Sequence, residues 1–341
     1  MESILFSVDG HSDLLKNIQG EIYSSGPLHT TISVGDINAQ KFSDGEVCVD
    51  FVTSVRGKRV YLLSSPDNSD KIMQLMFAID AAKRAAAAEI IPILPYFPYA
   101  RQDKKDQVRG PIGAKVMAEM LEQRGATQVI TFDLHADQIQ GFFNIPVLHM
   151  EGKYLFDRYI YDLHNSSEAP LVLCAPDAGA AKRVKHFRDQ IRERWGIDLP
   201  MVMIDKTRPR ANEVGEMVLI GDVKDKHVVI VDDMCDTGGT LIKAASELCL
   251  NGAIGVTAIV THGVLSGPAL NRIFDAKEDK ILIDFVCSDT LPIGDREIFL
   301  EQGVHPKAEE FITIVSTAKQ ITNAIKAINQ NRSVEVLKHV G

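Results

Sequence analysis

Apolar and polar positions alternate along this chain in a pattern that predicts repeated strands and helices. Short β-branched runs are typical of strands that are buried on both faces of a parallel sheet. We expect such strands at residues 32–34, 47–52, 60–63, 90–94, 128–132, 171–175, 201–204, 228–231, 255–261 and 281–287. Helices are expected at residues 71–88, 112–123, 241–250 and 317–329. This alternation predicts an α/β fold in which mostly parallel sheets are flanked by helices.

The strands and helices form two series. The polar stretch 164–169 precedes the second series, and 341 residues are enough for two domains that each bury a core. We therefore expect an N-terminal domain over residues 1–155 and a C-terminal domain over residues 156–316. The terminal segment, residues 317–341, can pack back on the N-terminal domain or pack on the other one.

One strand leads into a loop with the chemistry of a phosphate site. The apolar run 228–231 stops at two carboxylates, and a small, hydroxyl-rich loop precedes the next helix. In open α/β sheets, ligands bind at the carboxyl ends of strands, where the first amides of the following helix point at an anion. Hydroxyls donate to phosphate oxygens, and carboxylates suit either sugar hydroxyls or a metal-bound substrate. The residues of this predicted phosphate site, which is a sugar phosphate site if the carboxylates accept from sugar hydroxyls, are Asp232, Asp233, Asp236, Thr237, Gly238, Gly239 and Thr240.

A second interpretation of this loop stays open. Paired acids after a strand can serve only to cap the next helix, with Asp236 and Thr237 as its N-cap. The ordered string of apolar strand, two acids, spacers and Asp-Thr-Gly-Gly-Thr is more specific than a lone glycine-rich loop. It is neither a Walker A loop nor a dinucleotide fingerprint.

Composition narrows the class of ligand. A net charge of −9 argues against general binding of nucleic acid through a basic surface. No apolar stretch approaches the length of a membrane span, and the first residues do not resemble a secretory signal. Five scattered cysteines without a C-x-x-C pair fit reduced thiols, so we expect a cytoplasmic protein. Small phosphates are the expected ligands.

Seven stretches together resemble the ribose-phosphate pyrophosphokinase family. The loop after residue 231 resembles the phosphoribosyl-pyrophosphate motif of the type I phosphoribosyltransferase fold. The other matching stretches are residues 42–46, 99–103, 133–143, 176–177, 205–212 and 261–267. The resemblance implies two tandem domains of type I phosphoribosyltransferase-like fold. It also implies an enzyme of nucleotide biosynthesis that transfers the β,γ-diphosphate of ATP to the C1 hydroxyl of ribose 5-phosphate, giving 5-phosphoribosyl-1-pyrophosphate and AMP.

The resemblance also implies roles for single residues. The catalytic cations are Lys206 and Arg208, from a loop that closes over the reacting phosphates. ATP is contacted by Arg101, Gln102 and His135, with an adenine pocket formed in part by Phe42, Asp44 and Glu46. On its own, the last segment predicts only a hairpin turn, because Asp-Gly is a strong turn signal.

A second loop is expected to hold the diphosphate. Its residues are Asp177, Ala178, Gly179 and Ala180, and alanine stands at the last position where the family usually has glycine. That alanine is expected to make the backbone less free. The implied cofactor is Mg²⁺, with His135 and Asp177 at the metal site; Mg²⁺ prefers oxygen, so His135 can instead contact ATP.

The resemblance implies homo-oligomers, built as dimers that group into larger, often hexameric, assemblies. The loop 42–46 would then be donated to the ATP pocket of the neighbouring subunit. Two alternatives remain: a phosphoribosyltransferase that shares the loop motif, and a non-catalytic homologue that regulates a true synthetase. The C-terminal domain and the 206–208 loop argue against a phosphoribosyltransferase. The presence of both the catalytic loop and the ATP loop argues against a non-catalytic homologue.

Overall fold

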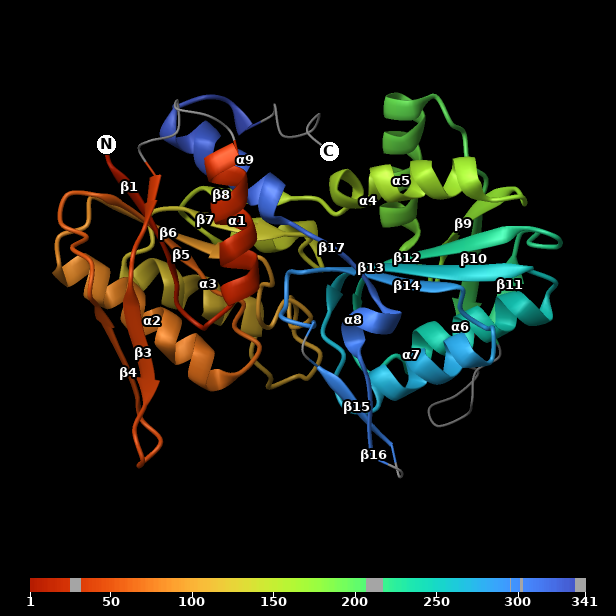
Figure 1. The fold of residues 1–341 in the computed structure, drawn as a ribbon, viewed down its shortest axis with the longest axis horizontal. Helices are drawn as coiled ribbons and strands as arrows, with labels where there is room; N and C mark the ends of the chain where they lie inside the picture. Colours follow the sequence, from red (N-terminus) through yellow and green to blue (C-terminus); the bar gives the residue numbers. More distant parts are fainter. Residues whose placement is uncertain (25–31, 207–216, 295, 301–302, 335–341) are drawn as a thin grey trace. The chain divides into compact units, whose positions relative to one another are not determined.

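The structure is a computed structural model of residues 1–341, and it describes all of them except 25–31, 207–216, 295, 301–302 and 335–341. The chain divides into two compact units. Unit 1 contains residues 1–151, 290–292 and 316–340, and unit 2 contains residues 152–289 and 293–315. Each unit is a mostly parallel sheet with helices on both faces (Figure 1). The predicted fold class is therefore confirmed.

The sheet of unit 1 has six strands that pair only in parallel. Their order is β2 (Ile32–Val34), β1 (Ser3–Ser7), β5 (Arg59–Leu63), β6 (Glu89–Leu94), β7 (Val129–Phe132) and β8 (Val147–Met150). Successive side chains of a strand point to opposite faces. In β5, Val60 and Leu62 join one buried cluster, while Tyr61 and Leu63 join the other. The central strand is thus buried on both sides, as its apolar sequence predicts.

Four helices cover these two faces. Helices α2 (Ser69–Arg84) and α3 (Gly113–Arg124) supply the cluster around Val60. Helices α1 (Ser12–Ser24) and α9 (Ala318–Asn329) supply the cluster around Tyr61, and Figure 1 shows them side by side. The last helix of the chain thus packs in the core of unit 1. A short 3₁₀ helix, η2 (Asp137–Phe142), follows β7.

The N-terminal strands differ from the expected ones. Strand β2 pairs with β1, whereas the hairpin around residues 42–46 consists of β3 (Ile37–Lys41) and β4 (Val47–Phe51). Strand β3 is mostly polar and exposed, so apolar periodicity could not indicate it. Gly45 has φ of +97°, which suits the expected turn.

Unit 2 repeats the same plan. Its strand order is β11 (Met217–Ile220), β10 (Met201–Lys206), β9 (Leu171–Ala175), β12 (His227–Cys235), β13 (Gly255–Gly263), β14 (Asp284–Ser288) and β17 (Thr313–Val315). Among these pairs, β10 with β11 is antiparallel and the others are parallel. A separate hairpin, β15 (Glu297–Leu300) with β16 (Gly303–Lys307), occupies much of the stretch 289–310.

Helices again cover both faces of the sheet. Helices α6 (Gly239–Leu250), α7 (Ala269–Glu278) and α8 (Ala308–Phe311) pack in one buried cluster. Helices α4 (Lys153–Ser166) and α5 (Ala181–Trp195) pack in the other.

Strand β12 is longer than its apolar run. Sheet pairing continues past Val231, with Asp232 opposite Val260 and Met234 opposite His262. The two carboxylates therefore belong to the strand and not to the loop, which corrects the sequence-based interpretation. Aspartate is rare in strands, but the equally long neighbour β13 provides pairing partners, and this context outweighs propensity.

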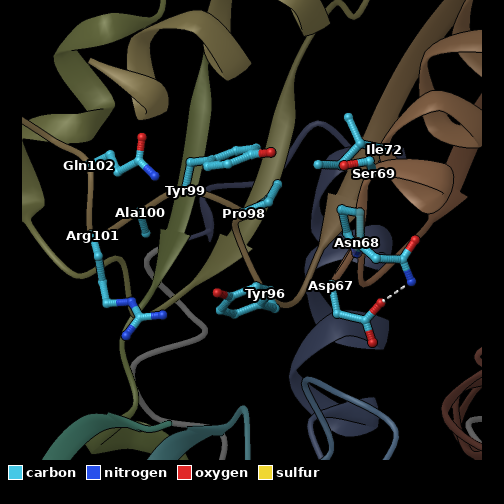
Figure 2. Close-up of a pocket in the computed structure, with 11 residues that line it drawn as sticks. Asp67, Asn68, Ser69, Ile72, Tyr96, Pro98, Tyr99, Ala100, Arg101 and Gln102 are labelled. Carbon is cyan, nitrogen blue, oxygen red and sulfur yellow. Dashed lines mark hydrogen bonds between the residues drawn. The ribbon is translucent and has the colours of Figure 1, made fainter. Parts of the chain in front are cut away.

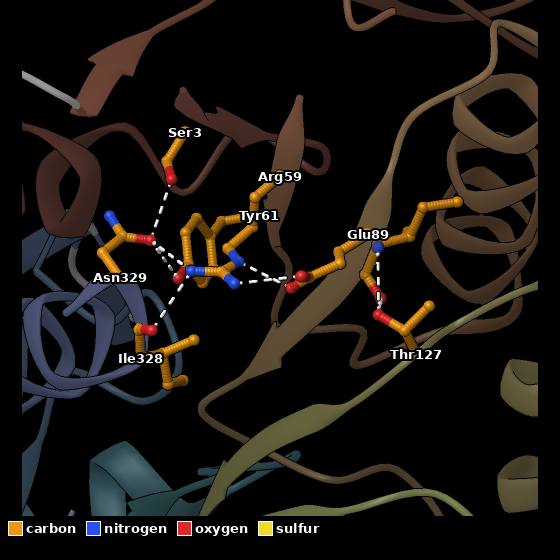
Figure 3. A network of polar contacts seen from close by, with 8 residues as sticks. Ser3, Arg59, Tyr61, Glu89, Thr127, Ile328 and Asn329 are labelled. Carbon is orange, nitrogen blue, oxygen red and sulfur yellow. Dashed lines mark hydrogen bonds and ion pairs between the residues drawn. The ribbon is translucent and has the colours of Figure 1, made fainter. Parts of the chain in front are cut away.

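A polar network fastens α9 to the sheet of unit 1 (Figure 3). Arg59 is almost fully buried and forms a two-pronged ion pair with Glu89, with N···O distances of 2.6 and 3.0 Å. Its Nη1 also donates to the carbonyl of Ile328 at 3.1 Å. Asn329 Oδ1 accepts from three donors, Arg59 Nη1, the Tyr61 hydroxyl and the Ser3 hydroxyl, at 3.0, 2.9 and 2.8 Å. The C-terminus of α9 is thus tied to β1, β5 and β6.

This network generates a stability prediction. Arg59→Met leaves the carboxylate of Glu89 and the carbonyl of Ile328 without their donor, and we expect the free energy of unfolding to fall by about 1.5–3 kcal/mol. Urea unfolding followed by circular dichroism measures it. Arg84→Met, which removes a solvent-exposed ion pair with Asp80, is the matched control and should change the unfolding midpoint far less.

The contribution of the Arg59–Glu89 ion pair to folding stability depends on pH, and the pKa of Glu89 gives the direction of the change. The hydrogen bonds from Arg59 lower the pKa of Glu89 below its ordinary value of 4.5. The ion pair therefore stabilises the folded state above pH 4.5 and stops doing so as the pH falls through the lowered pKa. The difference between wild type and Arg59→Met should shrink in acid. Equal differences at pH 7 and pH 3 would contradict this assignment.

Candidate active site

Two neighbouring loops form the predicted sugar phosphate and diphosphate sites of unit 2. Strands β9 and β12 are adjacent and parallel, so the loops that follow them lie at the same edge of the sheet. In the first loop, Asp177 Oδ1 accepts a hydrogen bond from the Ala180 amide at 3.1 Å. Helix α5 begins at the next residue.

Alanine at position 180 does not disturb this loop. Ala180 has φ of −78° and ψ of −12°, which any L-residue adopts, and its methyl group is buried in the core below α5. The conformation at position 180 therefore does not require glycine. At Gly179, by contrast, a Cβ would lie 3.2 Å from Asp177 Oδ1, so a side chain there would crowd the carboxylate.

The second loop is held by its own neighbours. The amides of Leu265 and Ser266 donate to the carbonyls of Cys235 and Asp236, each at 3.0 Å. Arg272 Nη1 donates to the carbonyl of Thr237 at 2.8 Å. The loop 235–240 is thereby fastened to the segment that leads into α7.

The capping interpretation of this loop is wrong. The N-cap of α6 is Gly238, in the left-handed region with φ of 74°, and no side chain forms a capping hydrogen bond. Asp236 and Thr237 precede the cap. The first amides of a helix have no carbonyl partner within the helix, and they carry the positive end of its dipole. The start of α6 can therefore receive an anion such as a phosphate.

Carboxylates are concentrated beside this loop. Asp233 is 5% exposed, and its amide donates to Asp232 Oδ1 at 2.9 Å. Burial, followed by repulsion from Asp233 and then from Asp177, raises the pKa of Asp232 from its ordinary 3.8 to about 8. Arg183 Nη2 on α5 lies 3.9 Å from Asp233 Oδ2. The edge thus offers carboxyl oxygens that are shielded from water, a setting suited to the hydroxyl donors of a sugar.

Unit 1 contains a cavity at the carboxyl edge of its own sheet. Its volume is about 390 Å³, and Arg101 and Gln102 are among its lining residues (Figure 2). The other lining residues are Pro66, Asp67, Asn68, Ser69, Ile72, Tyr96, Pro98, Tyr99 and Ala100. A volume of this size is in the range of small-molecule sites.

The wall of the cavity formed by the start of α2 is ordered by hydrogen bonds. Asn68 caps α2 by accepting from the Lys71 amide at 3.0 Å, and it donates to Asp67 Oδ1 at 2.8 Å (Figure 2). Lys71 Nζ pairs with the same carboxylate at 3.0 Å. On the other wall, Tyr99 has φ of +59°, an uncommon conformation for a bulky residue. Aromatic rings, an amide and the Arg101 guanidinium thus line one space.

Other predicted ATP residues lie elsewhere in unit 1. His135 is exposed in the loop after β7. Phe42, Asp44 and Glu46 are exposed on the tip of the β3–β4 hairpin, where the Glu46 amide donates to Asp44 Oδ1 at 3.0 Å. None of these four residues lines the cavity. Of the predicted catalytic pair, the main chain of Lys206 ends β10, its side chain is outside the described part of the structure, and Arg208 lies outside the described residues.

Sequence reasoning missed several residues at these two edges. Arg183 and Arg272 come from helices that follow the loops, while Tyr96 and Asn68 come from neighbouring segments of the cavity. Of these four residues, only Arg183 could have been identified from the sequence around it. The first turn of α5 has basic residues and no acidic one, although the helix dipole favours the reverse, and this indicates a nearby anion.

In the part of the chain that the structure describes, no group of three or more His, Cys, Asp or Glu side chains is arranged to hold a metal ion. None of the helices described is both long and apolar enough to cross a membrane.

The fold defines a class of protein: two tandem α/β units of phosphoribosyltransferase type. Comparison with known proteins agrees. A model of the N-terminal domain of ribose phosphate pyrophosphokinase matches residues 3–125, and a model of the phosphoribosyl transferase domain matches residues 149–285.

Individual relatives narrow the class to a family. The ribose-phosphate pyrophosphokinase of Porphyromonas gingivalis is 41% identical over 89% of this chain and 90% of its own length. Ribose-phosphate pyrophosphokinase 2 of Schizosaccharomyces pombe is 38% identical over 98% of this chain and 96% of its own length. The crystal structure of phosphoribosylpyrophosphate synthetase from Mycobacterium smegmatis has a TM-score of 0.81, with 33% identity over 97% of this chain and 100% of that one. The chain belongs to the ribose-phosphate pyrophosphokinase family, which confirms the predicted family and the prediction of an enzyme.

The raised pKa of Asp232 generates a prediction. A carboxyl group whose pKa is higher in the folded state stabilises that state while it is protonated, and this stability is lost as the pH rises from about 3.8 to about 8. Asp232→Asn cannot ionise. Its melting temperature relative to wild type, measured by calorimetry without ligand, should increase over that pH range and then level off. A constant difference between pH 5 and pH 8.5 would contradict the raised pKa.

Proposed function

We propose that this chain transfers the β,γ-diphosphate of ATP to the C1 hydroxyl of ribose 5-phosphate, giving 5-phosphoribosyl-1-pyrophosphate and AMP. Membership of the family over nearly the whole chain supports the reaction. The observation that carries the assignment of the sugar site is the end of β12, where Asp232 and Asp233 meet the start of α6.

In this proposal, the edge of unit 2 binds ribose 5-phosphate and the transferred diphosphate, and the edge of unit 1 binds ATP. In this proposal the 5-phosphate binds at the amides of Gly238, Gly239 and Thr240, which begin α6. The sugar hydroxyls donate to Asp232 and Asp233. The transferred diphosphate lies along the loop formed by Asp177, Ala178, Gly179 and Ala180. Asp236 and Thr237 complete the sugar phosphate loop.

ATP is assigned to the edge of unit 1. Arg101 and Gln102, which line the cavity, bind the nucleotide, and His135 contacts it from the next loop. The C1 oxygen of the ribose attacks the β-phosphorus and loses its proton, while the bond to the α-phosphate oxygen breaks and AMP leaves. Lys206 and Arg208 stabilise the negative charge that develops on the phosphate oxygens, a role that depends on positioning and electrostatics.

We propose Mg²⁺ as the metal. Mg²⁺ usually binds through one or two carboxylates together with substrate phosphates and water, so it does not need a complete cage of protein ligands. Asp177, a half-buried carboxylate on the diphosphate loop, fits that role, and His135 is the second candidate ligand. When bound, the metal would neutralise phosphate charge.

The first test is formation of AMP from ATP that depends on ribose 5-phosphate. A phosphoribosyltransferase or a non-catalytic regulator would form none, so an inactive wild-type protein that binds both ligands would overturn the proposal. In an active protein, Asp232→Ala with Asp233→Ala should weaken ribose 5-phosphate binding by about 1.5–3 kcal/mol for each lost charged hydrogen bond. Calorimetry should find ATP affinity little changed. Unaltered sugar phosphate affinity in the folded double variant would end the assignment of the two carboxylates.

The proposal includes assembly and location. We propose homo-oligomers built from dimers, of which a hexamer is one form, with the 42–46 loop completing the neighbour's ATP site. The support is that Phe42 is 51% exposed at a hairpin tip, so a neighbouring subunit that covers it would remove apolar surface from water. All five cysteines are free thiols, which supports a cytoplasmic location.

Subunit mixing tests the shared site. Lys206→Ala should lower kcat by about 10²–10³, and Asp44→Ala with Glu46→Ala should also be inactive. In a mixed pair, the subunit with the altered loop keeps Lys206 and receives an intact loop from its partner, so one of the two sites is whole. Random reassociation of equal amounts makes about half of the pairs mixed, and activity should recover to about a quarter of wild type.

A control variant separates exchange from complementation. A chain with all three substitutions, mixed with either variant, should restore nothing. If labelled subunits exchange and the two variants still show no recovery, then the loop serves its own subunit.

A further inference from the structure

The carboxylates of the sugar site lie close to a cation that neither the motif nor the family comparison identifies. Arg183 is the third residue of α5, and its Nη2 lies 3.9 Å from Asp233 Oδ2. Both side chains are shielded from water, with exposed fractions of 18% for Arg183 and 6% for Asp233. Coulomb attraction is screened little in such a place.

Packing fixes the position of this guanidinium. Val184 and Phe187 of α5 are in the same buried cluster as Val229 and Val231 of β12. Asp233 is two residues after Val231, so strand alternation directs its side chain toward the face that α5 covers. Arg183 therefore comes from the helix that packs on this face.

The location of Arg183 is otherwise unfavourable. A cation in the first turn of a helix opposes the helix dipole, and α5 has no acidic residue in that turn. Asp233, in turn, is a buried carboxylate that also repels Asp232. An ion pair between the two offsets part of both costs.

We infer that Arg183 is a positioning residue for ribose 5-phosphate: it holds the Asp233 carboxylate ionised and fixed as an acceptor for the sugar hydroxyls. This inference rests on the proposed function. Arg183 acts through Asp233 and has no contact with substrate of its own. The acidic pair at the end of β12 is therefore a triad of two carboxylates and one guanidinium.

The inference predicts a selective kinetic defect. Arg183→Gln should raise the KM for ribose 5-phosphate by about 10-fold to 100-fold, as expected if the sugar loses its hydrogen bond to an ionised Asp233, and should leave the KM for ATP within about twofold. Arg183→Lys should give an intermediate KM, because it keeps the charge but loses the planar fork. Arg192→Gln on the same helix is the matched control. Arg192 is 56% exposed and pairs with Asp189, so this variant should behave as wild type.

A double-mutant cycle decides whether Arg183 acts through Asp233. In an Asp233→Asn background, Arg183→Gln should change the KM for ribose 5-phosphate by less than about twofold, because the partner is already neutral. An undiminished effect in that background would show that Arg183 touches the substrate itself, and no effect in the wild-type background would show that it does not position the site. Either result overturns the inference. Failure of the proposed function is separate, because it appears as an inactive wild-type protein.

The single tryptophan provides a check of folding on the same helix. Trp195, at the end of α5, stacks on Tyr161 with ring centroids 4.1 Å apart, so its fluorescence reports whether α5 is in place. If Arg183→Gln loses this signal, Arg183→Lys makes the same comparison. The lysine variant should then raise the KM for ribose 5-phosphate in the wild-type background and leave it unchanged in the Asp233→Asn background; any other pair of results overturns the inference.

Discussion

The burial of two adjacent carboxyl groups at the end of β12 is the constraint on which the rest of unit 2 depends. Pairing with β9 ends at Ile230, but pairing with β13 continues through Asp232 to Cys235 and keeps the two residues in place, although burial of adjacent carboxylates is costly. The surrounding elements reduce that cost: Arg183 lies beside Asp233, and the amino end of α6 follows within a few residues. What remains uncompensated is suited to a ligand that brings hydroxyl donors, as the proposed binding of a sugar at this site requires.

The two units share a fold but carry different side chains at the carboxyl edges of their sheets. These side chains, and not the fold, decide which ligand each edge suits. Both units place a central strand, a loop and a helix in the same order, yet β5 is followed by Ser64, Ser65 and Pro66 where β12 ends in two aspartates. Without an acidic pair, the edge of unit 1 has instead a cavity lined by aromatic rings and Arg101. In the proposed function, the same α/β plan presents a nucleotide site on unit 1 and a sugar phosphate site on unit 2.

The sequence predicts those parts of the structure that are encoded within a short segment. Strand β9 was predicted at residues 171–175 because its five residues are apolar and a polar loop follows. Strand β12 was predicted too short because aspartate has a low strand propensity, while its true length depends on pairing with β13. The motif 232–240 was recognisable because its residues are contiguous. Arg183, Asn68 and Tyr96 were not, because their roles arise only when separate segments pack together.

The diphosphate loop shows why a departure from a motif needs a structure to interpret it. A position requires glycine only if its φ is positive or if a Cβ there would be crowded. At position 180 neither condition holds, since the backbone is helical and the added methyl group fills the core beside α5. Position 179 is the constrained one, because a Cβ there would press on Asp177 Oδ1. Asp177 is also the carboxylate whose hydrogen bond to the Ala180 amide shapes the turn. The proposed function of this loop therefore depends on a single glycine and one aspartate, both of which this chain retains.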